Sequence, residues 1–257
     1  MQMEFIDTHS HLYDEAFAGE EDAALERAVE AGVTRLIFPD IDSQSREAMF
    51  AFADRHPGKI YPCLGLHPTS VDADWEKEVS HMEGYLGRRI HAIGEIGIDC
   101  YWSKEFLDQQ KEVLRIQLEM ASRLDLPVII HSRESTELII NILKECRHLG
   151  TRGVFHAYSG SRETFRELDR LGDWYIGIGG VLTYKKASIA ETVKDIPLDR
   201  ILLETDSPYL TPVPFRGKRN ESSYIPYIAQ KLAELKGLEI SEIAATTTEN
   251  AHKLFRI

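Results

Sequence analysis

Short apolar runs, most of them rich in isoleucine, valine and leucine, recur along the chain between polar, helix-like segments. Runs of this length bounded by polar residues are typical of buried β-strands. We expect strands at residues 5–7, 35–39, 60–66, 90–95, 127–131, 153–156, 174–179 and 201–206. Most of the segments between them suit helices, and the 3.6-residue period of an amphipathic helix is clearest from Ser103 to Leu124, with a second helix expected from Arg162 to Leu171.

Eight strands alternating with helices predict one α/β domain, residues 1–257, folded as a (β/α)8 TIM-type barrel. In such a barrel the active site lies at the carboxyl ends of the strands. The alternative is an open doubly wound sheet, which normally has a glycine-rich turn after its first strand. The sequence Thr-His-Ser-His after the first expected strand lacks glycine. The proline-rich segment 211–227 is expected to form a loop over the carboxyl end of the barrel.

The formal net charge of −12 argues against a broad basic surface that grips nucleic acid. A nucleic-acid substrate stays possible, because bound metal cations or a local patch can hold a phosphate. No apolar run approaches the ~20 residues that cross a bilayer, and the first residues lack signal-peptide features. Three widely spaced cysteines are typical of reduced thiols. We therefore expect a cytoplasmic protein without membrane contact.

His9 and His11 follow the first expected strand. Residues two apart on an extended strand point to the same side, so both imidazoles can hold one cation. A His-x-His pair alone is a weak signal, because two partly exposed turn histidines fit equally well. The later strand ends strengthen the metal interpretation.

Those later strand ends also finish in residues that bind metals. They carry Glu95, His131, His156 and Asp206. Each has an ordinary alternative: a salt bridge for Glu95, a core histidine for His131 or His156, and a turn cap for Asp206. In a barrel all of them converge on one face. Together with His9 and His11 they exceed what one tetrahedral ion needs, which indicates a two-metal site with Glu95 as the bridging carboxylate.

The chain resembles the TatD family of metal-dependent deoxyribonucleases, within the amidohydrolase-like barrels. The resemblance runs nearly from end to end and rests on several motifs in order. These are Phe-Ile-Asp-Thr-His-Ser-His-Leu at 5–12, Gly-Leu-His-Pro at 65–68, Ala-Ile-Gly-Glu-Ile-Gly-Ile-Asp at 92–99, Leu-Pro-Val-Ile-Ile-His-Ser-Arg at 126–133, Phe-His-Ala-Tyr-Ser-Gly at 155–160, Leu-Glu-Thr-Asp-Ser-Pro-Tyr-Leu at 203–210 and Arg-Gly-Lys-Arg-Asn at 216–220.

The resemblance implies a cytoplasmic TIM-type barrel that hydrolyses phosphodiester bonds of DNA, as a 3′-to-5′ exonuclease that prefers single strands. It implies divalent metal ions as cofactors, two of them with the identity open among Mg²⁺, Mn²⁺ and Zn²⁺. RNA is a second possible substrate, and no obligate protein partner is evident. By matching motif, the ligands are His9, His11, Glu95, His131, His156 and Asp206.

The expected mechanism is attack by a metal-activated water, with Asp206 and Glu95 as the catalytic carboxylates. Arg133 is suited to a two-pronged phosphate contact. Lys218 and Arg219 form a basic pair in the late loop, and the family pattern makes His67 a substrate contact or a neighbour of the ligands. Two aromatics can stack a base, although such side chains more often pack under a loop; they are Tyr101 and Trp102.

Two departures from the family pattern concern substrate fit. No proline follows Asn220-Glu, and Ala157 and Tyr158 replace a more usual Cys-Phe pair. The competing enzyme hypothesis is a metal-dependent amidohydrolase that cleaves an amide, ester or lactone, or an aminoacyl-tRNA deacylase. Many binuclear relatives bridge their metals with a carbamylated lysine on the fourth strand, and residues 90–99 hold no lysine. The third hypothesis is a barrel that binds metal or a protein partner without catalysis.

Overall fold

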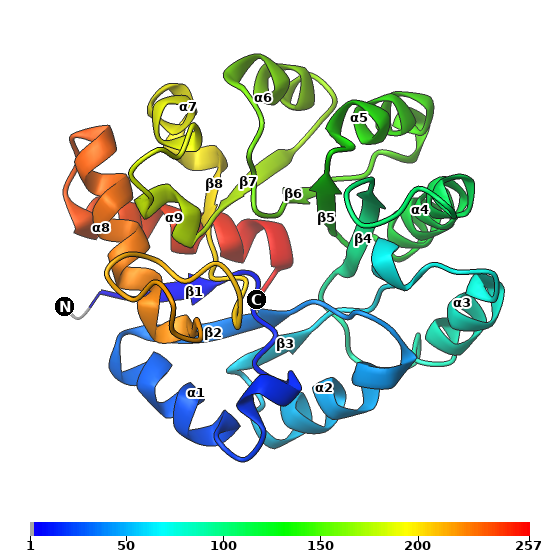
Figure 1. The fold of residues 1–257 in the computed structure, drawn as a ribbon, viewed down its shortest axis with the longest axis horizontal. Coiled ribbons are helices and arrows are strands. Elements are labelled where there is room, and N and C mark those ends of the chain that lie inside the picture. Colours follow the sequence, from blue (N-terminus) through cyan, green and yellow to red (C-terminus); the bar gives the residue numbers. More distant parts are fainter. Residues whose placement is uncertain (1–2) are drawn as a thin grey trace.

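The computed structural model describes residues 3–257, which form a closed barrel of eight parallel strands (Figure 1). One run of paired strands is β1-β2-β3 and the other is β4-β5-β6-β7-β8. Isolated bridges join them, from Leu64 to Ile93 and from Ser10 to Ser207. The strands are β1 (Phe5–Asp7), β2 (Val33–Phe38), β3 (Ile60–Pro62), β4 (Ile93–Asp99), β5 (Val128–Arg133), β6 (Gly153–Phe155), β7 (Trp174–Ile178) and β8 (Ile201–Leu203).

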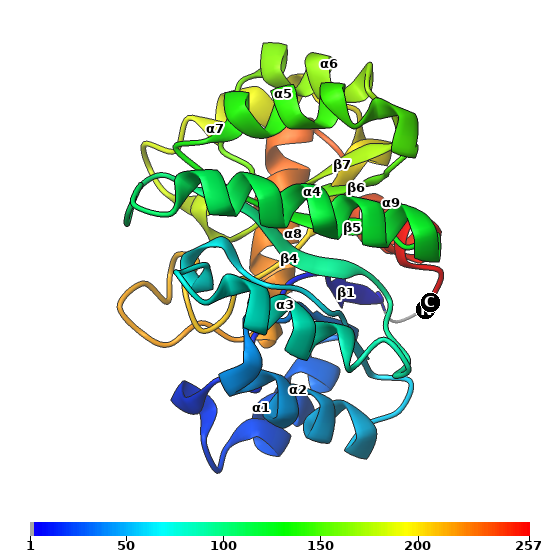
Figure 2. The same cartoon turned by 90° about the vertical axis from the view of Figure 1, so that its right-hand side faces the viewer.

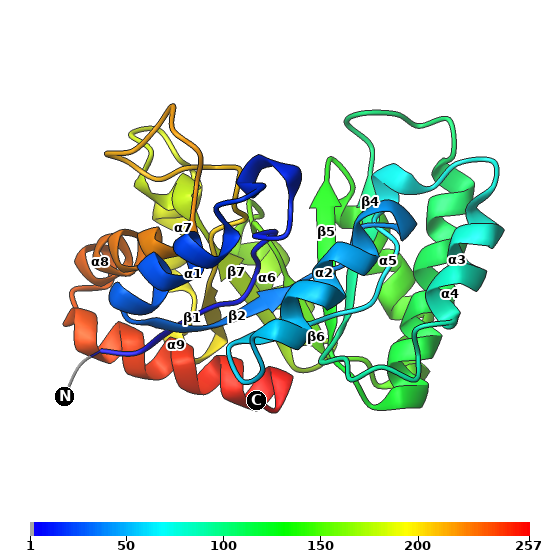
Figure 3. The same cartoon turned by 90° about the horizontal axis from the view of Figure 1, so that it is seen from below.

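Helices surround the barrel, and Figure 2 shows α3, α4 and α5 in order across its outer side. The final helix instead runs under the amino ends of the strands, where it packs against β1 and β8 (Figure 3). The helices are α1 (Glu21–Glu30), α2 (Ser43–Arg55), α3 (Trp75–Glu83), α4 (Leu107–Leu124), α5 (Thr136–Glu145), α6 (Arg162–Asp169), α7 (Ile189–Asp195), α8 (Ile225–Lys236) and α9 (Ile240–Phe255). Within residues 3–257, no helix combines the length and the apolar character that a membrane crossing requires.

The barrel interior is filled by one side chain from each strand or its immediate flank. α9 covers this layer from below with Ala251, Leu254 and Phe255. The layer therefore closes the amino end of the barrel with apolar packing and leaves the carboxyl end for polar groups. Its members are Ile6, Ile37, Cys63, Ala92, Ile129, Val154, Tyr175 and Leu202.

All eight expected strands are present, but some boundaries differ from the sequence prediction. β4 continues to Asp99 instead of ending at Glu95, because its pairing with β5 extends through Gly97 opposite His131. The helix expected from Ser103 begins at Leu107. The predicted loop 211–227 ends early, since α8 begins at Ile225 with a proline in its first turn, a position where proline is well tolerated.

A fully buried ion pair joins the segment after β2 to α2. Arg46 donates from Nε to Asp40 Oδ2 at 2.7 Å, and both side chains have 0% exposure. The guanidinium also donates to the carbonyl of Gly65 at 3.2 Å. Burial raises the pKa of Asp40 to about 7, although Arg46 opposes the shift. The main chain of Asp40 accepts from Glu95 N at 3.0 Å and donates to Gly94 O at 2.9 Å, so this pair anchors the backbone of β4.

Replacing Arg46 by leucine is expected to lower the free energy of unfolding by about 3–5 kcal/mol, because Asp40 is then buried without a cation. The matched control is Arg55→Leu on the same helix, whose partner is Asp22 at 3.7 Å and whose side chain is 54% exposed. Its cost should stay below about 1 kcal/mol. Urea denaturation measures both variants, and equal losses would contradict a dominant role for the buried pair.

Candidate metal centre

Several polar residues of the site lie two positions after an apolar residue of the layer below them. Side chains two residues further along a strand face the same way, so His131 follows Ile129, His156 follows Val154 and Glu204 follows Leu202. Glycine occupies the corresponding place after Tyr175, and a Cβ on Gly177 would lie 2.0 Å from the Glu204 carboxylate. The absence of a side chain there makes room for the polar layer.

β1 and β8 are joined at their carboxyl ends by Asp7, which holds the first and the last strand of the barrel together. Its carboxylate accepts from the backbone N–H of His9 at 3.2 Å and of Thr205 at 2.9 Å. The Thr205 hydroxyl donates to it as well. Asp206 N then donates to the carbonyl of His9 at 2.9 Å. These bonds hold the segments that carry His9 and Asp206 side by side.

One half of the site gathers His9, His11 and Asp206 around Glu95 Oε2. His9 Nε2 lies 3.1 Å from His11 Nε2 and 3.1 Å from Glu95 Oε2. Asp206 Oδ1 lies 3.8 Å from the Nε2 atoms of both histidines. His9 and Glu95 are 0% and 2% exposed, and Asp206 is 16% exposed. Asp206 therefore forms the edge of the group toward solvent.

The other half gathers three histidines around Glu95 Oε1. His131 Nδ1 lies at 2.9 Å, His67 Nε2 at 3.5 Å and His156 Nε2 at 3.8 Å from this oxygen. The His67 Nδ1 atom accepts from Thr69 N at 3.2 Å. In a neutral His67 the proton therefore sits on Nε2, which makes His67 a donor toward Glu95 in the metal-free site.

The site has an outer set of polar groups that the sequence reasoning did not assign. His131 Nε2 lies 2.9 Å from Asp99 Oδ2, and His11 Nδ1 lies 2.9 Å from the Tyr13 hydroxyl. His156 Nδ1 lies 3.1 Å from Glu204 Oε1, although not at hydrogen-bond geometry. Asp99 and Glu204 belong to the motifs around Glu95 and Asp206, but only the side-chain contacts reveal their partners.

The ionisation of the histidines differs across the site. Burial lowers the pKa of His9 well below its usual value and that of His11 to about 4, so both are neutral at pH 7. Burial also acts on His131, but hydrogen bonds to Asp99 and Glu95 raise its pKa to about 9. Glu204, Glu95 and Asp206 outweigh burial at His156 and raise its pKa to about 10.

The carboxylates respond in opposite directions. Burial alone would raise the pKa of Glu95, but the surrounding histidines, His9 foremost, hold it well below its usual value. Burial raises the pKa of Asp206 to about 7, with His156 opposing the shift. In the metal-free site Glu95 is thus an anion at neutral pH, whereas Asp206 gains and loses its proton near pH 7.

This donor set fits divalent cations. His9, His11 and Asp206 offer ligand atoms within 4.8 Å of one another. The same holds for two further groups, which are His9, Glu95 and His156, and His67, Glu95 and His131. His9 and His11 are neutral and their Nε2 atoms lie 3.1 Å apart, so both rings can offer a lone pair to a cation without first losing a positive charge. At His131 a proton on Nδ1 occupies the place beside Glu95 that a cation can take. The structure thus brings all six expected ligands together, and their role as ligands stays a prediction.

Three of the other residues expected to bind substrate, Arg133, Tyr101 and Trp102, lie against one another. The Arg133 guanidinium lies 3.7 Å from the centre of the Tyr101 ring and 5.3 Å from that of Trp102. All three side chains are exposed at the carboxyl ends of β4 and β5. They form a compact cationic and aromatic surface, so Tyr101 and Trp102 do not pack under a neighbouring loop.

Lys218 and Arg219 differ in their surroundings. Lys218 is exposed, with its ammonium 5.9 Å from the centre of the Phe215 ring. Arg219 donates to Glu20 at 2.6 Å and to the carbonyl of Ala16, so its charge is already paired with the segment after β1. The structure therefore gives Arg219 a role in fastening the late loop, and it leaves Lys218 available to contact a ligand.

Comparisons with known proteins agree with this geometry. Residues 6–256 match the family described as TatD related DNase. A Bacillus subtilis (strain 168) protein named uncharacterized metal-dependent hydrolase YabD is 42% identical, covering 98% of this chain and 99% of that protein. An Erwinia tasmaniensis protein named 3′-5′ ssDNA/RNA exonuclease TatD is 33% identical, covering 98% of this chain and 100% of that protein. The crystal structure of YjjV, a TatD homologue from Escherichia coli K12, has a TM-score of 0.89 and 32% identity over 98% of both chains.

Metal binding is expected to release protons and to strengthen as pH rises from 6 to 8. The pKa values of His131 and His156 are raised to about 9 and about 10, so both carry protons at neutral pH that a cation must displace. Each displaced proton gives up to about tenfold in apparent affinity per pH unit. Calorimetric titration with Zn²⁺ or Mn²⁺ in buffers of different ionisation enthalpy measures this release. An affinity that does not change with pH would contradict the proposed displacement.

Replacing Asp99 by asparagine is expected to weaken metal binding about 10–100-fold, because the variant no longer fixes the ring of His131 with a carboxylate. The backbone contacts from Tyr101 N and Trp102 N to Oδ1 can be kept by the amide oxygen. Titration with a competing chelator measures the affinity, and urea denaturation of the metal-free protein checks the fold. Wild-type affinity in a folded variant would contradict this role.

Proposed function

This chain belongs to the TatD family of metal-dependent hydrolases, and we propose that it cleaves phosphodiester bonds of nucleic acid. The observation that carries the proposal is a single buried carboxylate, Glu95, with imidazoles gathered on both of its oxygens at the carboxyl mouth of the barrel. The proposed substrate is single-stranded DNA, with RNA as the second possibility, and the proposed direction is 3′ to 5′. A relative with 33% identity bears the name of an exonuclease of that kind.

We assign two divalent cations to this site, with Mg²⁺, Mn²⁺ and Zn²⁺ as the candidates. His9, His11 and Asp206 would hold one, His131 and His156 would hold the other, and Glu95 would serve both. When bound, such cations lower the pKa of water, polarise the phosphate and offset charge on the leaving oxygen. The imidazole-rich set suits Zn²⁺ or Mn²⁺ better than Mg²⁺, which prefers oxygen ligands.

Asp206 is the proposed general base. It lies at the solvent edge of the cluster, and a carboxylate beside a metal-bound water can accept a proton from it. It takes a proton from the attacking water, whose oxygen bonds to phosphorus as the bond to the 3′-oxygen breaks. The departing 3′-oxygen receives a proton, so each cleavage consumes one water and yields a 3′-hydroxyl and a 5′-phosphate.

The contacts proposed for substrate surround this centre. Arg133 can hold a phosphate with two parallel donors, and the exposed Tyr101 and Trp102 rings beside it can stack a base. Lys218 approaches from the loop after β8, and His67 can donate from Nε2. A cytoplasmic location is also proposed, since Cys63, Cys100 and Cys146 are all free thiols.

The test is digestion of single-stranded oligonucleotides labelled at either the 3′ or the 5′ end. Metal-stripped protein should be inactive, and activity should return with Mg²⁺, Mn²⁺ or Zn²⁺. Glu95→Gln should show no activity with any of them, and Asp206→Asn should lower kcat by about 10²–10⁴-fold. Glu26→Gln, an exposed change on α1, is the matched control and should behave as wild type.

The pattern of fragments decides the direction of cleavage. Early release of the 3′ label as a mononucleotide, with the 5′ label in a ladder of shortening products, supports the 3′-to-5′ direction. A wild-type protein that binds metal and leaves DNA and RNA intact would refute the nuclease proposal. The hydrolysis of amides, esters or lactones would then be the better explanation of the same metal centre.

A further inference from the structure

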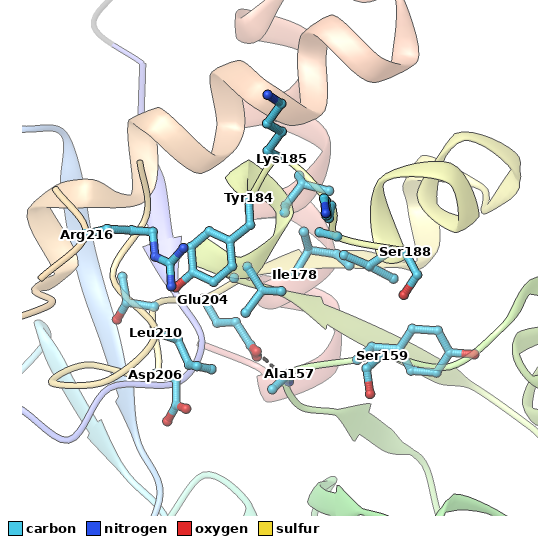
Figure 4. A pocket seen from close by; sticks show the side chains of 18 residues that line it. Ala157, Ser159, Ile178, Tyr184, Lys185, Ser188, Glu204, Asp206, Leu210 and Arg216 are labelled. Atoms are coloured by element: carbon cyan, nitrogen blue, oxygen red, sulfur yellow. Dashed lines mark hydrogen bonds between the residues drawn. The ribbon is translucent and has the colours of Figure 1, made fainter. Parts of the chain in front are cut away.

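A cavity of about 600 Å³ opens beside the metal centre, on the side of Asp206 (Figure 4). Its walls come from the segments that follow β6, β7 and β8, including the short 3-10 helix η4 (Gly180–Thr183). Asp206 lines it, so the cavity and the metal centre share this carboxylate. Its volume is within the range of about 300–1,000 Å³ that is usual for pockets holding small organic ligands.

One part of the cavity wall is apolar and aromatic. Ile178, Leu182 and Ile189 are buried and supply aliphatic surface. The Tyr184 ring also lines the cavity, and its hydroxyl donates to the carbonyl of Thr211 at 3.0 Å, which fixes the ring. A fixed aromatic face beside aliphatic side chains suits a planar nucleobase, since every base can stack on it.

The rest of the lining includes three exposed cations, namely Lys185, Lys186 and Arg216. No carboxylate in the described part of the chain, residues 3–257, forms an ion pair with any of them. The Arg216 guanidinium lies 4.3 Å from the centre of the Tyr184 ring. In Figure 4 the Lys185 side chain extends away from Asp206 and from the centre of the drawn group, and its exposed, flexible stem lets the ammonium turn toward a ligand in the cavity. In a chain of net charge −12, three such cations gathered at one cavity indicate an anionic ligand.

We propose that this cavity is a subsite for the nucleotide whose 3′-oxygen leaves when the phosphodiester bond is cleaved. Its base lies against Tyr184 and the aliphatic wall, and its own 5′-phosphate is held by Lys185, Lys186 and Arg216. The inference rests on the proposed nuclease function and adds a preference for substrates in which that nucleotide carries a 5′-phosphate. A strand's 3′-terminal nucleoside carries no second phosphate, so the cations assign the cavity to the nucleotide on the other side of the cleaved bond.

Two dinucleotides that contain the same cleavable bond and differ only in a 5′-phosphate measure this preference. They are thymidylyl-(3′→5′)-thymidine and the same molecule with a 5′-phosphate. Water adds across the phosphorus–3′-oxygen bond in both. The first yields thymidine and thymidine 5′-phosphate, and the second yields two molecules of thymidine 5′-phosphate. We expect wild-type kcat/KM to be at least about tenfold higher for the phosphorylated dinucleotide, as a charge-assisted contact warrants.

The triple variant Lys185→Ala/Lys186→Ala/Arg216→Ala should reduce the ratio of the two kcat/KM values to near one. Lys253→Ala on α9, at the opposite end of the barrel, is the control and should keep the wild-type ratio. A binding measurement independent of activity accompanies it. Fluorescence anisotropy measures the binding constant of a labelled single strand in a metal chelator at several salt concentrations. In the variant the logarithm of this constant should fall less steeply with the logarithm of the salt concentration, by about 0.7 for each phosphate that is no longer bound.

Closing the cavity gives a second test that leaves the cations in place. Ser188 lines the cavity, is exposed and forms no capping hydrogen bond at the start of α7. Ser188→Trp should lower kcat/KM for both dinucleotides at least about tenfold, because both must place a nucleoside there. The matched control is Ser241→Trp, at an exposed serine in the first turn of α9, which should behave as wild type.

The outcomes separate this inference from the function on which it rests. If the wild-type protein with metal cleaves neither dinucleotide nor longer DNA, the nuclease proposal fails. If it cleaves DNA but treats the two dinucleotides alike, or if the triple variant keeps the preference, the subsite inference is overturned. A preference for a 3′-phosphorylated dinucleotide instead would also overturn it, since the cavity would then hold the terminal nucleotide.

Discussion

The burial of one negative charge is the constraint on which this structure depends. Glu95 is 2% exposed inside the barrel mouth. An isolated carboxylate in such a place would cost several kcal/mol, so it needs cationic or hydrogen-bonding partners on both oxygens. His9 and His131 supply the shortest contacts, at 3.1 Å and 2.9 Å. A site that must neutralise a fixed anion with imidazoles is also a site prepared for divalent cations.

The scaffold keeps this arrangement in place through contacts outside the cluster. The Asp40–Arg46 pair holds the backbone on which Glu95 sits, and Asp7 joins the segments that carry His9 and Asp206. Buried polar contacts of this kind rigidify a core when they are satisfied. The apolar layer beneath, closed by α9, keeps water out of the amino end of the barrel. The open carboxyl end is thereby the polar end of the interior.

The surroundings of the centre divide its mouth into two unlike sides. Arg133 with Tyr101 and Trp102 lies at the ends of β4 and β5, and the cavity with Tyr184 lies beyond β6, β7 and β8. Each side combines aromatic surface with cations, which is the combination that single-stranded nucleic acid requires. An acidic protein can thus bind a polyanion locally, because cations are gathered where the substrate is proposed to lie.

The sequence by itself determined the eight strands and the barrel, and with them the convergence of the strand-end residues on one face, since these follow from local apolar runs that alternate with helical segments. Its motifs also identified the six candidate ligands. Only the tertiary structure decided that β4 extends to Asp99, that Asp99 contacts His131, that Glu204 lies beside His156, and that Glu20 pairs with Arg219. Pairs such as Glu20 and Arg219 are far apart in the chain. Their contacts arise from closure of the barrel and from the paths of its loops, and local sequence patterns carry no information on either.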